Sequence, residues 1–234
     1  MTIALTFCGL SASGAALIAY DQFVHRREAS ERRRSWLKYF VYLIYLGAMV
    51  SVRWWGWWPA VVAIAALSAT ACVEAARLLS GQKRAACAVV FVVVAGVGHL
   101  ALLSPPEWSE AFFVVAVADS FAQLLGRLFG RRPLCPQISP GKTVEGFVGG
   151  VLSAAAFSVV IACAWTSRSV GAALLVGTSV ALAATFGDLF FSTIKRRRRV
   201  KDFSRLIPGH GGVLDRIDSL VWAAPVFYWL QPSL

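Results

Sequence analysis

Long runs of apolar residues constrain the fold of this chain more than any other feature. Of its 234 residues, 58% are hydrophobic and 15% are charged, whereas soluble domains carry about 25% charged residues. A helix that crosses a bilayer needs about 20 largely apolar residues. Eight segments of this kind can be marked, at 2–20, 37–52, 54–76, 85–103, 107–125, 144–166, 170–192 and 213–231. We therefore expect an all-α, polytopic integral membrane protein with about eight transmembrane helices, built as one domain over 1–234.

The basic residues predict how these helices are oriented. If the helices alternate in direction, the connections after the first, third, fifth and seventh lie on one face of the membrane. Together with their helix ends, these connections hold every Lys and Arg except Arg53 and Arg168. Loops rich in Lys and Arg stay in the cytoplasm. We therefore expect these loops to be cytoplasmic, in the cell inner membrane or an equivalent membrane, with both chain ends outside.

The same topology accounts for the net charge of +11. The positive charges lie at helix ends, beside anionic lipid headgroups, so nucleic-acid binding is not needed to explain them. The first apolar segment lacks a preceding basic region, which favours an anchor over a signal peptide. The five cysteines form no CxxC pair and indicate neither a disulfide framework nor a zinc site.

Acidic residues within the apolar segments are the most informative polar residues, because a charge in lipid is costly. For the first of them, an ion pair with Arg77, three residues later, is the favoured explanation. The third begins a helix, where a role as cap or dipole partner and a functional role remain equally open. The six residues are Glu74, Asp119, Glu145, Asp188, Asp215 and Asp218.

Three of these acids suggest a metal site. Asp188, Ser192 and Lys195 are spaced four and three residues apart, so they share one helical face. Asp215 and Asp218 share a face of the next helix, where their charges repel unless a cation intervenes. Hard oxygen ligands of this kind suit Mg²⁺ or Mn²⁺. The alternative is that each aspartate pairs with one of the many basic residues.

Two polar loops on the predicted cytoplasmic face suggest phosphate binding. In the first, Lys142 belongs to a Gly-Lys-Thr sequence, but Pro136 stands where a P-loop needs glycine and no strand is expected before it. The following helix could still receive a phosphate at its start. The second loop offers glycines for close backbone approach and basic donors, with Arg197–Arg199 interpreted as headgroup anchors. The residues involved are Ser139, Lys142 and Thr143 in the first loop, and Lys195, Arg196, Lys201, Arg205, Gly209, His210, Gly211 and Gly212 in or beside the second.

These motifs resemble those of a known family. The pattern runs through Ser192-Thr-Ile-Lys195-Arg196, Lys201-Asp202, Pro208-Gly-His210-Gly211-Gly212 and Asp215-Arg216-Ile-Asp218. With Gly187-Asp188 and the segment 138–146, it is similar to the phosphatidate cytidylyltransferases, also called CDP-diacylglycerol synthases. The resemblance covers about residues 118–219, and the N-terminal half resembles the family only in hydropathy. A Gln stands at 123 where the family usually has Tyr.

The resemblance implies a reaction and a site. CTP and phosphatidate would give CDP-diacylglycerol and pyrophosphate, in a homodimer within membrane lipids, with Mg²⁺ and by analogy K⁺. The helices of 1–105 would support a catalytic half over 106–234. The implied catalytic residues are Asp188, Lys195, Asp215 and Asp218, of which the three aspartates hold the metal. The implied substrate-binding residues are Ser139, Lys142, Thr143, Ser192, Arg196, Lys201, His210, Gly211, Gly212 and Arg216.

Other functions remain as alternatives. A CTP-dependent kinase of a polyprenol or related lipid would release CDP rather than pyrophosphate. A CDP-alcohol phosphotransferase is disfavoured because Asp218 is followed by Ser219, whereas that class has a D-x2-D-G motif. A non-catalytic transporter or lipid-binding protein would place acids near the middle of the bilayer, whereas these acids cluster towards one end of their helices.

Overall fold

A computed structural model describes residues 2–24, 29–166, 168–207 and 211–231. Within these ranges the chain forms eight α-helices, a 3₁₀ turn, a π-helical turn and one short hairpin. The α-helices are α1 (Thr2–Val24), α2 (Ala29–Val52), α3 (Trp57–Leu78), α4 (Lys83–Gly98), α5 (Pro105–Phe129), α6 (Val144–Ile161), α7 (Val170–Arg197) and α8 (Leu214–Leu230). The turns are η1 (His99–Leu102) and η2 (Ala162–Thr166), and the strands are β1 (Pro133–Cys135) and β2 (Ser139–Thr143).

The helices confirm the expected all-α membrane fold. Six segments of the described chain are long and apolar enough to cross a bilayer: Ser30–Val52, Trp57–Leu78, Lys83–Leu102, Pro105–Phe129, Val144–Trp165 and Val170–Arg197. All six coincide with predicted apolar segments, and α1 and α8 occupy the remaining two. The observed α7 continues five residues beyond its predicted end, because Thr193–Arg197 extend the helix towards the basic loop.

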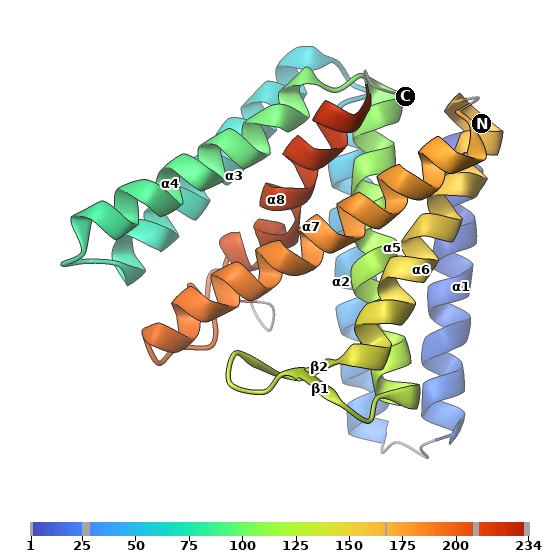
Figure 1. Ribbon diagram of the computed structural model, residues 1–234, viewed down its shortest axis with the longest axis horizontal. Coiled ribbons are helices and arrows are strands. Elements are labelled where there is room, and N and C mark those ends of the chain that lie inside the picture. Colours follow the sequence, from blue (N-terminus) through green and yellow to red (C-terminus); the bar gives the residue numbers. More distant parts are fainter. Residues whose placement is uncertain (1, 25–28, 167, 208–210, 232–234) are drawn as a thin grey trace.

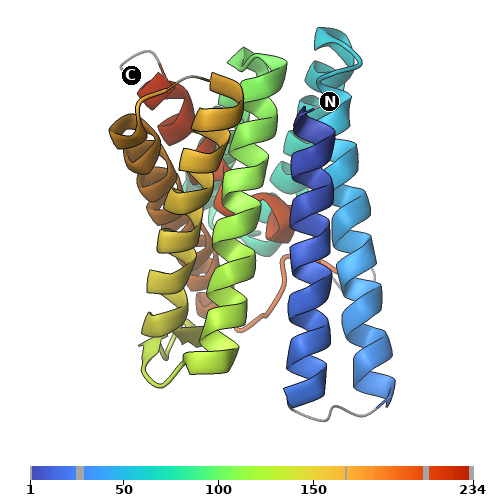
Figure 2. The ribbon, with the colours of Figure 1, turned by 90° about the vertical axis from the view of Figure 1, so that its right-hand side faces the viewer.

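The helices pack in two tilted groups around α8. In Figure 1, α5 and α6 stand beside the α1–α2 pair, and the α3–α4 pair leans to the other side. Figure 2 shows α1 and α2 side by side at the edge of the bundle. Helix α8 packs against α3, α4, α5 and α7. Helices from both halves of the sequence therefore contribute to one core.

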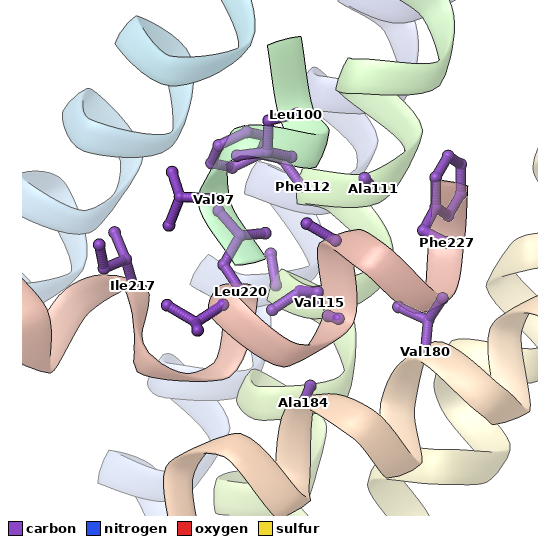
Figure 3. Packing of buried hydrophobic residues seen from close by; sticks show 14 of the residues in the cluster. Val97, Leu100, Ala111, Phe112, Val115, Val180, Ala184, Ile217, Leu220 and Phe227 are labelled. Atoms are coloured by element: carbon purple, nitrogen blue, oxygen red, sulfur yellow. The ribbon is translucent and has the colours of Figure 1, made fainter. Parts of the chain in front are cut away.

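The core surrounds the apolar face of α8. Ile217, Leu220 and Phe227 point from α8 towards Val97 and Leu100 of the α4–η1 segment and towards neighbouring side chains of α5 and α7 (Figure 3). Ile217 and Phe227 are fully buried. This packing fixes the rotation of α8 about its axis, which decides where the aspartates on its other side point.

Helices α7 and α8 approach closely where the aspartates begin. A Cβ at Gly187 would lie 2.6 Å from the Asp218 carbonyl oxygen and 2.8 Å from the Trp222 ring. Only glycine fits there, as is common where helices pack in membranes. This contact places Asp188, the next residue, beside the first turns of α8.

The hairpin corrects one expectation. No strand was expected near the Gly-Lys-Thr sequence, but β1 and β2 pair antiparallel, with Pro133 opposite Thr143 and Cys135 opposite Ser139. The lysine lies within β2 rather than in a loop after a strand. The segment is therefore still not a P-loop, and its strand pairing holds Lys142 at a fixed height above the end of α7.

Candidate active site

Asp188 joins the hairpin to α7. Its carboxylate forms an ion pair with Lys142 of β2 and accepts a hydrogen bond from the Ser192 hydroxyl at 3.2 Å. The predicted stripe of Asp188 and Ser192 on one face of α7 is confirmed. Both partners of the ion pair remain about a quarter exposed. The pair is therefore open to exchange with a ligand that carries phosphate or a metal ion.

Lys195 lies between the two aspartates of α8. Its Nζ is 2.7 Å from Asp215 Oδ1 and 3.7 Å from Asp218 Oδ2. The ammonium also lies 5.4 Å from the centre of the Phe203 ring. All three charged residues are buried. The sequence correctly placed them together, but the group that separates the two carboxylates is an ammonium of this chain.

Asp215 also anchors the loop that precedes its helix. Asp215 Oδ2 accepts hydrogen bonds from the backbone N–H groups of Phe203, at 2.8 Å, and Gly212, at 2.9 Å. Gly211 has φ +82°, a conformation that favours glycine. A bridge between Ile207 and Gly211 closes the loop. Asp215 thus has a positioning role that spacing did not predict.

A third helix adds a further carboxylate to this cluster. The charges of Asp188 and Asp119 both act on Asp218, and the Lys142 and Ser219 side chains lie beside Asp119. Asp218 Oδ1 meanwhile accepts a hydrogen bond from the Ser219 N–H at 2.8 Å. Asp119 stood out in the sequence as an acid on α5 but was not assigned a role. The structure adds it to the site.

These donors suit a hard cation in their chemistry. They are carboxylate oxygens from α5, α7 and α8, and each set is now balanced by the ammonium of Lys142 or Lys195. In the part of the chain that the structure describes, no three acidic, histidine or cysteine side chains lie together as a ready metal site. The metal site formed by Asp188, Asp215 and Asp218 therefore stays a prediction.

The start of α6 is held by residues expected to bind substrate. The Thr143 hydroxyl accepts a hydrogen bond from Gly146 N at 3.1 Å and so caps the helix. Glu145 Oε2 accepts hydrogen bonds from the N–H groups of Arg131 and Arg132, at 3.0 and 3.2 Å. Glu145 thus fastens the entry to β1. Ser139 begins β2, opposite Cys135.

The remaining predicted binding residues lie around this cluster. Arg196 donates to the carbonyl of Ile138 at 3.0 Å and to that of Val200 at 2.8 Å. It therefore ties the end of α7 to the hairpin turn. Lys201 and Arg216 are exposed. His210 lies outside the described residues, as do Pro208 and Gly209.

Comparison with known proteins assigns this arrangement to a family. The model of the cytidylyltransferase family matches residues 16–233. The chain belongs to the cytidylyltransferase family. The match includes every residue of the carboxylate cluster, so the family resemblance seen over residues 118–219 extends through almost the whole chain.

Individual relatives of the cytidylyltransferase family match a shorter stretch. A phosphatidate cytidylyltransferase of Haemophilus influenzae is 46% identical over 121 residues, which are 50% of this chain and 42% of that protein. One from Aquifex aeolicus is 45% identical over 119 residues, 51% of this chain and 44% of the relative. An uncharacterized Escherichia coli protein, YnbB, is 45% identical over 120 residues, 50% and 40% of the two chains. The aligned segments thus span less than half the length of these relatives.

Glu74 of this cytidylyltransferase family member has a different role from the one expected. It accepts hydrogen bonds from Ser204, Val213 and Leu214. The expected ion pair with Arg77 is not among the contacts of the described residues. The acid inside an apolar helix was a valid signal, but its partners lie more than 100 residues away in sequence, where spacing gives no information.

Proposed function

We propose that this protein transfers the cytidylyl group of CTP to phosphatidate, giving CDP-diacylglycerol and pyrophosphate. An oxygen of the lipid phosphate attacks the α-phosphorus of CTP. The bond from that phosphorus to the oxygen that bridges to the β-phosphate breaks, and pyrophosphate leaves. Lipid names among the relatives support phosphatidate as the acceptor. Family membership supports CTP as the donor.

The observation that carries this proposal is the buried cluster of Lys195, Asp215 and Asp218 beside the exposed pair of Lys142 and Asp188. Two reacting anions need positive charge to approach one another and fixed groups to align them. The two ammonium groups supply such charge at neighbouring positions. A phosphate monoester has a second pKa near 6, so the lipid phosphate is nucleophilic at pH 7 without a dedicated base.

Each group of residues has its own part in the proposal. Lys142 and Lys195 neutralise phosphate oxygens, and Asp215 holds Lys195 in place. Ser139 and Thr143 form the nucleotide end of the site together with the start of α6. Arg196 keeps the hairpin turn against α7, and exposed Lys201 and Arg216 attract the anionic substrates. Ser192 orients Asp188, and Gly211, Gly212 and His210 line the approach of the phosphates.

A divalent metal ion completes the proposed site. Asp188, Asp215 and Asp218 would hold Mg²⁺, with Asp119 beside them, since their oxygen donors suit it. When bound, the ion would neutralise the triphosphate and stabilise the charge that develops on pyrophosphate. A neighbouring K⁺ is expected from the family resemblance alone.

We place this site on the cytoplasmic face of an inner or equivalent membrane. The hairpin and the connection between α1 and α2 lie at one end of the bundle, and the first turn of α1 and the last of α8 lie at the other (Figure 2). The first of these ends carries the basic loops, which the charge rule assigns to the cytoplasm. A homodimer is expected from the resemblance.

Product analysis tests the proposed reaction. The purified protein is incubated with Mg²⁺, labelled CTP and a panel of lipid phosphates and lipid alcohols. We expect CDP-lipid and pyrophosphate in equal amounts, with phosphatidate as acceptor. A CTP-dependent lipid kinase would instead release CDP and a phosphorylated alcohol. The absence of both reactions in folded protein would support a non-catalytic role.

A further inference from the structure

We propose that Glu74 is a positioning residue for the active site, acting from α3 on the loop and helix that carry Asp215 and Asp218. This proposal rests on the proposed cytidylyl transfer for its kinetic readout. Glu74 lies within a helix of the N-terminal half, and its side chain does not contact the carboxylate cluster through any recorded bond. Its effect on chemistry must therefore pass through the backbone that it holds.

The contacts of Glu74 are specific and buried. Glu74 is 5% exposed. Its Oε1 accepts hydrogen bonds from the Ser204 hydroxyl at 2.7 Å and from Val213 N at 3.0 Å. Its Oε2 accepts one from Leu214 N at 2.9 Å. Both carboxylate oxygens are thus used, and each donor belongs to the loop or to the first turn of α8.

The carboxylate supplies a cap that the local sequence lacks. Val213 occupies the N-cap position of α8 and makes no side-chain capping hydrogen bond. The first N–H groups of a helix have no partner within the helix, and a negative charge near them is favourable. Glu74 provides both the acceptor and the charge from another helix. The start of α8 is therefore fixed to α3.

Two carboxylates hold the loop from opposite sides. Asp215 accepts from Phe203 N and Gly212 N, whereas Glu74 accepts from the next residue in each case, Ser204 and Val213. Both ends of the segment between 203 and 213 are thus fastened twice. Without Glu74, Asp215 would alone have to hold the loop while it also binds Lys195. Glu74 leaves the Asp215–Lys195 pair in one geometry.

Gly212 records this contact in the sequence. A Cβ at Gly212 would lie 2.5 Å from Glu74 Oε2 and 2.7 Å from Oε1, closer than real Cβ contacts. Glycine is required at 212 because the Glu74 carboxylate fills the space of a side chain. The two positions are therefore predicted to be coupled energetically, although they are distant in sequence.

Hydrogen exchange and kinetics of Glu74→Gln test the proposal together. We expect faster amide exchange at 203–206 and 211–215, with exchange in α5 and α6 unchanged. We also expect kcat, per folded molecule, to fall about 100-fold, because a small misplacement of reacting groups costs that much. Glu74→Asp should recover part of the loss, since it keeps the charge. Unchanged loop exchange, or a full kcat per folded molecule, would overturn the proposal.

A matched control separates positioning from simple helix capping. Glu107 Oε2 accepts from Ser104 N at 2.8 Å in the capping box of α5, at the far end of the bundle. We expect Glu107→Gln to lower thermal stability while kcat per folded molecule stays within about twofold, as for ordinary substitutions away from a site. Equal kcat losses in the Glu74 and Glu107 variants would contradict a specific role for Glu74.

A double-mutant cycle provides an independent test. We expect Gly212→Ala to speed exchange at 211–215 strongly in the natural background and much less in a Glu74→Ala background, where the space is free. Additive effects would overturn the assigned contact. Exchange needs no turnover, so this arm decides on the Glu74 contact even if no CDP-lipid forms. Failure of the unsubstituted protein to form CDP-lipid would instead count against the proposed function.

Discussion

Buried charges occur at both ends of the bundle, and they are arranged in different ways. At the end away from the hairpin, Arg168 Nη1 and Nη2 donate to the two oxygens of Glu110 at 2.8 and 3.0 Å. Arg168 Nη2 also donates to Gln231 Oε1 at 2.8 Å. Glu110 is fully buried and the Arg168 side chain is 8% exposed. One cation thus matches one anion in a bidentate pair.

At the hairpin end, like charges face one another. Asp119, Asp188 and Asp218 act on one another electrostatically, and Lys195 lies 1 Å closer to Asp215 than to Asp218. A balanced buried pair mainly holds helices together, because removal of one partner leaves a buried charge. Crowded like charges in an accessible site more often indicate chemistry. The contrast predicts that one cluster carries activity and the other stability.

The largest effect is expected for Asp218→Asn. Asp218 loses its charge but keeps its shape, so the packing of α8 should survive while the proposed metal and substrate site loses a carboxylate. We expect pyrophosphate release from CTP and phosphatidate to fall about 100-fold or more. Initial rates per folded molecule measure this. Retention of more than a third of the rate would remove Asp218 from the catalytic cluster.

Glu110→Gln should have the opposite profile. It leaves the Arg168 guanidinium buried without its anion, which costs about 3 kcal/mol or more. We expect a lower unfolding midpoint by circular dichroism in detergent, with the rate per folded molecule nearly unchanged. Replacing Glu110 and Arg168 together by apolar residues should be less damaging than the single change. A selective loss of turnover without loss of stability would contradict the comparison.

Lys142→Met is expected to have a smaller effect on activity. Lys142 is a quarter exposed and pairs with Asp188 from the hairpin, so its loss should weaken CTP binding without disturbing the core. A charge-assisted hydrogen bond contributes about 1.5 kcal/mol, which predicts an increase in KM for CTP of about tenfold. Steady-state kinetics over a range of CTP concentrations measure it.

Arg197→Gln is the control for this loss of charge. Arg197 is exposed at the end of α7, where it was interpreted as a headgroup anchor. We expect KM for CTP to change by less than about twofold. An equal increase in the two variants would indicate a general effect of positive charge rather than a defined contact at Lys142.

The sequence predicted the helices well because membrane thickness imposes a length and a composition that can be read directly. It also predicted the face shared by Asp188 and Ser192, since neighbours at helical spacing meet whatever the tertiary fold. Their hydrogen bond confirms this. The face shared by Asp215 and Asp218 was likewise correct, because both carboxylates point towards Lys195.

Features that depend on distant partners were missed. The segment from Pro133 to Thr143 has prolines and few β-branched residues, so its hairpin gave no strand pattern. Glu74 was assigned to Arg77 because local spacing offers only local partners. The role of Asp215 as a loop anchor depends on the backbone of Phe203, which no side-chain pattern reveals.

The most direct test of the central comparison measures pyrophosphate release by Asp215→Asn and Glu110→Gln, per folded molecule, under the same conditions. Each change removes one buried negative charge with little change in volume. We predict that Asp215→Asn falls below about 1% of the unsubstituted rate, whereas Glu110→Gln keeps at least about half. Substantial turnover by Asp215→Asn, or equal losses in the two variants, would contradict the account.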